Sequence, residues 1–225
     1  MYTKRTRQKH VREMIPILEQ EYPDAGPRLN FSTPFELLIA SILAAQCTDE
    51  RVNEVTETLF DKYKTPQDYI DSDKDTLIEE IFSTGAYSRK ANRIKLCCKT
   101  LIEKFDSKVP DNMDDLISLP GVGRKTANML LVNCYDKPGI IMDTHLVRVS
   151  ERLGLTDKKT PDKMEEDLME VVAKKNWSAF SHLIMFHGQS VCVSRKPRCE
   201  KCKISRYCDY YRKKLWWSQI HGGYH

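Results

Sequence analysis

The chain has 225 residues, of which 30% are charged, 40% hydrophobic and 9% aromatic. This balance is typical of a globular protein and too apolar for an intrinsically disordered one. Glycine and proline are sparse, which excludes collagen-like sequence and argues against a loop-rich β-protein. No apolar run approaches the roughly 20 residues that cross a bilayer, and the basic start leads into no signal-peptide core. These features predict a cytosolic protein that does not associate with membranes.

Positive charge is concentrated near the C-terminus, although the net charge is only +4. Between Arg195 and Lys214 there are nine Lys or Arg residues and two acidic ones. Such clustering is the electrostatic footprint of a phosphate-binding surface. A solvated basic face would have the same composition, so charge alone leaves both interpretations open.

Helical periodicity begins at the N-terminus, where Val11, Met14, Ile15 and Leu18 share one face. A second helix is predicted from Thr33-Pro34-Phe35-Glu36, which combines an N-cap, a proline at the first helical position and a capping-box glutamate. This helix is apolar on all sides and ends near Gln46, so it should be buried.

Further helices are predicted along the rest of the chain, at about 49–63, 73–83, 88–105, 112–118, 124–134, 144–153, 161–175 and 177–189. Only Gly139–Met142 looks extended, and so short a segment does not make a sheet. The predicted fold class is all-α, with two closely packed helical bundles and no obvious linker between them.

A tight turn of sequence Gly121-Val122-Gly123 separates two predicted helices. Glycines let a turn pass close to another molecule, and the N-terminus of the next helix is a potential anion site. A DNA phosphate is a suitable anion, although a plain turn between helices would look the same.

Two polar residues stand at predicted helix starts. Lys125 lies in the first turn after the glycine turn, where the helix dipole disfavours a cation and, with partial burial, would favour the neutral, nucleophilic amine. A simple phosphate contact is the alternative role. Asp143 directly follows an apolar run and is expected to cap the helix that begins there, a role compatible with catalysis.

The eight cysteines fall into two groups. Those at 47, 97, 98 and 134 lie in apolar helical patterns and are assigned to packing. The other four, Cys192, Cys199, Cys202 and Cys208, lie in the most polar stretch, which indicates metal binding rather than disulfides. Four thiolates hold either zinc or a [4Fe–4S] cluster, and the single CxxC pair on a helical background favours the cluster.

In this order, the stretch LPGVGRKTAN, the aspartate of IIMDTHLVRV and the C-x6-C-x2-C-x5-C tail resemble the endonuclease III family of helix-hairpin-helix DNA glycosylases. The resemblance extends from Leu29 through Cys208 and includes LAAQCTD and FHG. It implies a six-helix domain at 27–137 that carries the hairpin, and a discontinuous cluster domain formed by 1–26 and 138–225. A DNA-binding cleft would lie between the two domains.

The resemblance also implies an activity and its cofactor. The protein would be a bifunctional DNA glycosylase and abasic-site lyase of base excision repair, which removes oxidised pyrimidines with Lys125 as nucleophile and Asp143 as its electrostatic and proton-transfer partner. The four clustered cysteines would hold a structural or redox-active [4Fe–4S] cluster. The partner would be double-stranded DNA with damaged pyrimidines or abasic sites, and the protein would bind it as a monomer. It would be a cytoplasmic, nucleoid-associated protein of a prokaryote.

The resemblance also implies DNA contacts at five places along the chain. In the first half these are Gln46; Gly85, Ala86 and Tyr87; and Gly121, Val122, Gly123, Arg124 and Thr126. In the second half they are His145 and Arg148, and the cysteine-loop residues Arg195, Lys196 and Arg198. The chain departs from the family at Ala86, which is smaller than the usual wedge residue, so Gln46 and the 85–87 loop together are expected to fill the gap left by a flipped base. The tail 215–225 matches no family pattern; it would pack on the cluster domain, bind a partner or be foreign to the natural protein.

Two other functions are consistent with parts of this pattern. A monofunctional mismatch glycosylase of the same fold typically lacks a lysine at position 125. A non-catalytic DNA-binding or redox-sensing iron–sulfur protein would need the hairpin and cysteines without the combination of Lys125 and Asp143. The presence of both residues favours the bifunctional enzyme.

Overall fold

The computed structural model describes residues 2–221, apart from the side chains of Ser218, Ile220 and His221. Its described residues contain helices and no β-strand, which confirms the predicted all-α class. The chain divides into two compact units. We call Pro27–Lys137 the hairpin unit, and Met1–Gly26 together with Pro138–His225 the cysteine unit.

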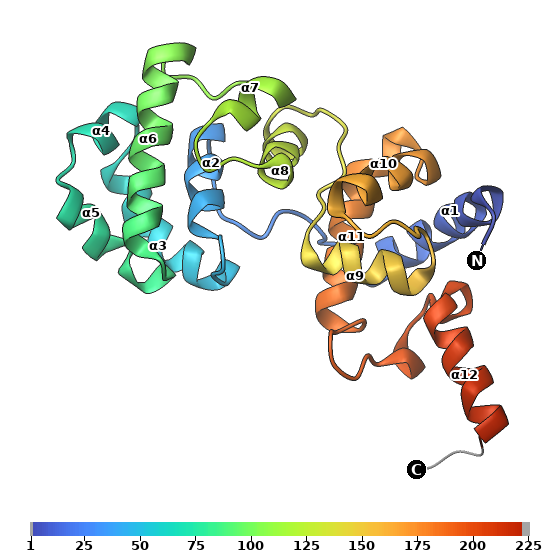
Figure 1. The fold of residues 1–225 in the computed structure, drawn as a ribbon. Coiled ribbons are helices and arrows are strands. Elements are labelled where there is room, and N and C mark those ends of the chain that lie inside the picture. Colours follow the sequence, from blue (N-terminus) through green and yellow to red (C-terminus); the bar gives the residue numbers. More distant parts are fainter. Residues whose placement is uncertain (1, 222–225) are drawn as a thin grey trace. The chain divides into compact units, whose positions relative to one another are not determined.

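The hairpin unit is built around α2 (Pro34–Leu43), which is buried from Leu37 through Leu43 as its sequence predicted. The helix packs against α3 (Asp49–Lys62), α6 (Tyr87–Phe105) and α8 (Arg124–Cys134), as Figure 1 shows. The remaining elements of the unit are α4 (Pro66–Asp71), α5 (Lys74–Glu80), η1 (Phe82–Thr84) and α7 (Met113–Ser118).

Three details of the hairpin unit correct the sequence analysis. The predicted extension of α2 to Gln46 is wrong, because the helix ends at Leu43 and the chain turns through Ala44–Gln46. The predicted helix 73–83 is divided into α5 and η1. The helix α4 was not predicted, although its capping box at Thr65, with the proline that follows, is the same signal that located the start of α2.

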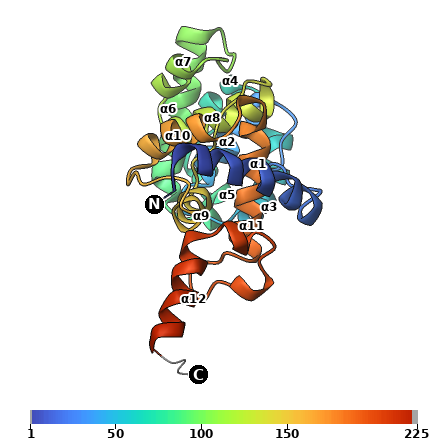
Figure 2. The same ribbon diagram turned by 90° about the vertical axis from the view of Figure 1, so that its right-hand side faces the viewer.

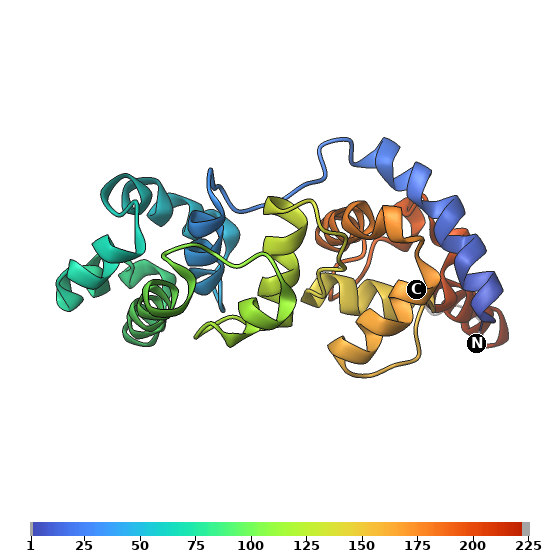
Figure 3. The ribbon, with the colours of Figure 1, turned by 90° about the horizontal axis from the view of Figure 1, so that it is seen from above.

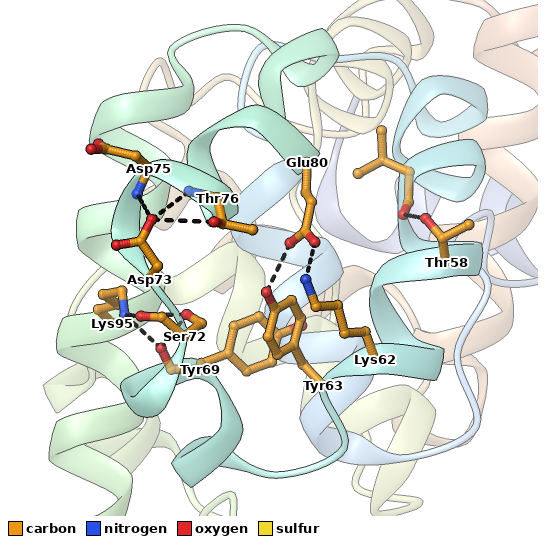
Figure 4. Close-up of polar contacts among 11 residues, drawn as sticks. Thr58, Lys62, Tyr63, Tyr69, Ser72, Asp73, Asp75, Thr76, Glu80 and Lys95 are labelled. Atoms are coloured by element: carbon orange, nitrogen blue, oxygen red, sulfur yellow. Dashed lines mark hydrogen bonds and ion pairs between the residues drawn. The ribbon is translucent and has the colours of Figure 1, made fainter.

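Polar contacts fasten α4 to α6 and α5 to the end of α3, as Figure 4 shows. The ammonium of Lys95 donates to the backbone carbonyls of Tyr69 at 2.8 Å and Ser72 at 2.6 Å, where α4 ends. The carboxylate of Glu80 on α5 accepts hydrogen bonds from Tyr63 and Lys62 at the end of α3. These bonds supply hydrogen-bond partners to backbone carbonyls and side chains that have none within the short helices.

The cysteine unit contains α1 (Lys4–Glu21), α9 (Thr144–Leu153), α10 (Pro161–Val171), α11 (Trp177–Ser190) and α12 (Asp209–His221), with three short 3₁₀ turns: η2 (Lys174–Asn176), η3 (Cys199–Lys201) and η4 (Ser205–Tyr207). Its core includes the predicted apolar face of α1, at Val11, Met14, Ile15 and Leu18. Helix α1 packs against α10 and α11, and Figure 3 shows it along the edge of this unit. The predicted helix 161–175 is shorter than expected, and Gly139–Met142 has no regular secondary structure.

The helix α12 was not predicted from the sequence. It contacts α9 and η4, and its far end runs away from the rest of the cysteine unit in Figures 1 and 2. The unusual tail from Leu215 to His221 continues this helix, with Trp216 and Trp217 each 62% exposed. The rest of the tail, residues 222–225, lies outside the described residues.

Two smaller expectations have clear outcomes. Cys97 and Cys98 are fully buried, and Cys47 and Cys134 are half-buried, in keeping with the packing role predicted for them. No helix in the described part of the chain is long and apolar enough to cross a membrane.

Candidate active site and cysteine pocket

The glycine turn of the hairpin unit connects α7 to α8. The amide of Val122 donates to the carbonyl of Leu119 at 3.1 Å, which closes the turn, and the Val122 side chain is buried. Gly121 has a φ of +90°, a conformation that disfavours any residue with a Cβ. The predicted tight turn is therefore confirmed, and its backbone requires glycine at position 121.

The first turn of α8 presents backbone amides without a side-chain cap. Gly123 is the N-cap residue, so no side chain accepts a hydrogen bond there. Arg124 and Lys125 are exposed and Thr126 is half-buried. The partial burial predicted for Lys125 is thus wrong for the protein by itself, because its place in the first turn directs its side chain to solvent.

Two exposed segments of the hairpin unit have unusual backbone conformations. Gln46 has a φ of 57°, and Gly85 and Ala86 have φ values of 68° and 47°. All three residues are exposed. Tyr87 is half-buried and stacks on Phe82, with ring centroids 4.5 Å apart. Left-handed conformations are uncommon at non-glycine residues, and those that do occur cluster at functional sites.

In the cysteine unit, Asp143 is the N-cap residue of α9, as the sequence predicted. One carboxylate oxygen accepts a hydrogen bond from the amide of Leu146 at 2.6 Å. In the first turns of the same helix, the guanidinium of Arg148 bonds the ring of His145 at 3.1 Å and the carbonyl of Gly188 at 2.8 Å. All three side chains are half-buried. Asp143 therefore has a fixed orientation at the positive end of α9.

The four clustered cysteines line one pocket and are all free thiols. Burial raises the pKa of Cys202 to about 12 and also raises the pKa of Cys208. No three His, Cys, Asp or Glu residues of the described chain are already arranged to hold a metal ion. The donor set nevertheless suits an iron–sulfur cluster, because four thiols converge on one space and carboxylates do not line it.

Two further residues hold the cysteine pocket together and were missed by the sequence analysis. Arg152 donates to the carbonyls of Val193 at 2.7 Å and Ser194 at 2.8 Å, and to the sulfur of Cys192 at 3.4 Å. His187 is 3% exposed and has its Nε2 3.5 Å from the sulfur of Cys202. Burial lowers the pKa of His187 to about 4, so its ring is neutral. The signal that could have found Arg152 is its place one helical turn after Arg148.

The loop between Cys192 and Cys199 carries the basic residues predicted to meet phosphates. Arg195, Lys196 and Arg198 are exposed, and Lys196 has a φ of 53°. The loop is tied back to α11, since the amide of Arg198 donates to the carbonyl of Val191 at 3.0 Å. Its charged side chains are therefore presented to solvent from an anchored backbone.

Comparisons with known proteins agree on one family. Residues 39–174 match the profile of the HhH-GPD superfamily of base excision DNA repair proteins. Endonuclease III of Synechocystis sp. is 42% identical over 90% of this chain and 93% of its own length. Two solved structures, a non-covalent endonuclease III–DNA complex and a trapped endonuclease III–DNA covalent intermediate, each superimpose with a TM-score of 0.89 and are 40% identical, covering 96% of this chain and 100% of the other.

Proposed function

This chain belongs to the HhH-GPD superfamily of base excision DNA repair proteins, and within it to the endonuclease III family; we propose that it removes oxidised pyrimidines from double-stranded DNA and then cleaves the strand. It is a bifunctional DNA glycosylase and abasic-site lyase of base excision repair. The observation that carries the proposal is the exposed amine of Lys125 in the uncapped first turn of α8, directly after the glycine turn.

The start of α8 is the proposed phosphate site. Backbone amides of the first turn point out of the helix, and the positive end of the helix dipole favours an anion. The turn at Gly121, Val122 and Gly123 has little side-chain bulk, so that the DNA backbone can approach closely. Arg124 and Thr126 add side-chain contacts to phosphate. Such contacts position the protein on DNA and leave lesion recognition to other residues.

Lys125 is the proposed nucleophile. A base inside a duplex is out of reach, so the nucleotide must first be flipped out, which costs least for a damaged base. The neutral amine of Lys125 then attacks the deoxyribose C1′, the bond from C1′ to the base breaks, and the base leaves with a proton. The C1′–O4′ bond of the sugar ring then breaks and O4′ takes up a proton, which leaves a protonated Schiff base between C1′ and Lys125. This Schiff base acidifies the C2′ proton; loss of that proton breaks the C3′–O bond, and water afterwards releases the lysine.

Asp143 is the proposed partner of this reaction. Its negative charge stabilises the cationic character that develops on the sugar when the base departs. The carboxylate also assists proton transfer during ring opening and elimination. The hydrogen bond from Leu146 keeps this side chain in one orientation, which limits the reorganisation needed during the reaction.

The remaining DNA contacts come from both units. Gln46 with Gly85, Ala86 and Tyr87 is proposed to fill the space left by the flipped nucleotide, since these exposed residues stand on strained turns. His145 and Arg148 contact DNA beside Asp143, although the Arg148 guanidinium also supports backbone carbonyls of its own unit. The exposed loop residues Arg195, Lys196 and Arg198 bind phosphates.

Cys192, Cys199, Cys202 and Cys208 are proposed to hold a [4Fe–4S] cluster, which when bound would cross-link the chain and fix the basic loop. None of the chemical steps at the sugar requires a metal. Arg152 orients the ligand loop through the carbonyls of the two residues that follow Cys192. The protein acts as a monomer on chromosomal DNA in the cytoplasm.

Borohydride trapping tests the assignment of Lys125. Borohydride should join the wild-type protein covalently to DNA that contains thymine glycol or an abasic site, because it reduces a Schiff base to a stable amine. Lys125→Gln should abolish the adduct while retaining most DNA affinity, since many other groups contact phosphate.

The same assay separates the competing functions. An adduct of full yield with Lys125→Gln would mean that another amine is the nucleophile. Wild-type protein that releases bases without a trapped adduct would be a monofunctional glycosylase. Binding of lesion DNA without release or cleavage would identify a non-catalytic protein, and a panel of duplexes with single defined lesions would establish the preferred bases.

A further inference from the structure

Lys90 has a buried ammonium group in the hairpin unit. The residue is only 1% exposed and lies in the first turn of α6, where its amide donates to the carbonyl of Ala86 at 3.0 Å. Its Nζ donates to the carbonyl of Leu43 at 2.6 Å and to the carbonyl of Thr84 at 2.7 Å. Burial lowers the pKa of Lys90. A buried ammonium is costly unless it is well bonded, so these two bonds are strong constraints on the segments that accept them.

Both acceptors lie at the points where a helix gives way to an exposed turn. Leu43 is the last residue of α2, and the chain beyond it reaches the left-handed Gln46. Thr84 is the last residue of η1, and the left-handed Gly85 and Ala86 follow it. One side chain therefore joins the base of the Gln46 turn to the base of the 85–87 loop. Strained residues keep their conformation only when the surrounding structure holds them.

Lys95 lies on the same helix but bonds only one segment, so the link between two separate turns is particular to Lys90. Its ammonium also donates to backbone carbonyls, those of Tyr69, Ile70 and Ser72. These acceptors all belong to one short segment at the end of α4, as Figure 4 shows in part. Lys95 thus stabilises the C-terminus of one helix, whereas Lys90 links two segments that are distant in sequence.

We propose that Lys90 is a positioning residue that locks the Gln46 turn to the 85–87 loop, so that both enter the duplex together as the nucleotide is flipped out. This inference rests on the proposed function, in which these two segments fill the gap in the base stack. Loss of the lock lets the two turns move independently. Excision of a base then slows, because the gap must be opened and filled while the nucleotide is extruded. Cleavage at an existing abasic site slows less, because no base has to be unstacked there.

Lys90→Met tests the proposal, since methionine fills the space of the aliphatic stem without an ammonium. Lys95→Met is the matched control, because it also removes ammonium–carbonyl bonds from the same helix, but none to the Gln46 turn or the 85–87 loop. Single-turnover rates are measured for base release from a thymine glycol duplex and for strand cleavage of a preformed abasic duplex. We expect base release by Lys90→Met to fall about 10–100-fold, the range in which misplaced groups slow catalysis. Strand cleavage should fall much less, and Lys95→Met should leave the ratio of the two rates at the wild-type value.

Further measurements keep the outcome decisive. Circular dichroism establishes that each variant is folded; if Lys90→Met is not, Lys90→Gln replaces it, because glutamine is polar but is too short to repeat both carbonyl bonds. In a double-mutant cycle, Lys90→Met and Gln46→Ala should be less than additive on base release if the lysine acts through that turn. An unchanged ratio of rates, or a change equal to that of Lys95→Met, overturns the proposal. Failure of the wild-type protein to release the base instead overturns the proposed function.

Discussion

Asp143 combines two roles that a single substitution can separate. The side chain caps α9 through the amide of Leu146, and the proposed reaction uses its negative charge. Asparagine is as good an N-cap as aspartate, so Asp143→Asn should leave the melting temperature nearly unchanged. Base release should slow by about 10²–10³-fold, which is typical for the loss of one electrostatic stabiliser.

The measurement for Asp143→Asn is single-turnover base release from thymine glycol DNA, with thermal denaturation as the control for folding. Some borohydride adduct on abasic DNA should survive, because the amine of Lys125 remains. Base release at the wild-type rate would show that the carboxylate serves only as a helix cap.

Gln46 is the residue at which a wedge function is most directly tested. Its side chain is exposed at the end of the turn after α2. Gln46→Ala should slow base release about tenfold, or about 1.4 kcal/mol of barrier, and slow cleavage of a preformed abasic site less. Gln46→Asn is the control, since asparagine also adopts the left-handed conformation readily. Equal effects of Gln46→Ala on both reactions would exclude a wedge role.

The helices α9 and α11 approach each other closely at Gly188. A Cβ at this position would lie 2.8 Å from the Cβ of His145 and 3.1 Å from its Nδ1. The nearest atom is attached directly to the backbone of α9, so the two helices would have to separate. The close approach brings His145 on α9 next to the helix that leads into the cysteine loop.

Overpacking in Gly188→Ala should therefore cost about 1–3 kcal/mol of the free energy of unfolding. The better helix propensity of alanine offsets about 1 kcal/mol at most, so the net loss should be up to about 2 kcal/mol. Chemical denaturation measures the change. The control is Gly26→Ala, where an added Cβ would come no closer than 3.9 Å to the carbonyl oxygen of Asp24. If the two variants are equally stable, the helices tolerate a wider spacing than their packing indicates.

Most helices could be predicted from the sequence, because apolar periodicity and N-cap residues are local features of the chain. Apolar residues of α1 recur on one face, and Thr33 and Asp143 accept the hydrogen bonds expected of N-caps. The helices α4 and α12 were missed because neither has a long apolar face: α4 has six residues, and α12 carries exposed Leu215, Trp216 and Trp217. Element ends were less accurate, since a helix ends where tertiary contacts replace its own hydrogen bonds.

For the whole molecule, metal content is the decisive measurement on the cysteine unit. Purified protein should be yellow-brown and contain about four irons per chain, as a [4Fe–4S] cluster requires. Removal of the iron should loosen the chain around η3 and η4, since Cys199 lies in η3, and Cys202 and Cys208 directly follow η3 and η4. Hydrogen exchange of these segments should rise, while that of α2 and α8 in the other unit should not. Stoichiometric zinc in a colourless, folded and active protein would reject the cluster.

The sequence by itself determined the helical class, the glycine turn, the capping role of Asp143 and the grouping of four cysteines in a polar stretch. Each of these follows from residues close together in the chain, whose side-chain types and spacing set local conformation. Only the tertiary structure decided that Lys90 is buried, because one of its two carbonyl partners lies 47 residues away. It also decided that Arg152 bonds the loop after Cys192, and that Lys125 is exposed. Burial and long-range hydrogen bonds depend on which helix ends meet in space, and no local pattern carries that information.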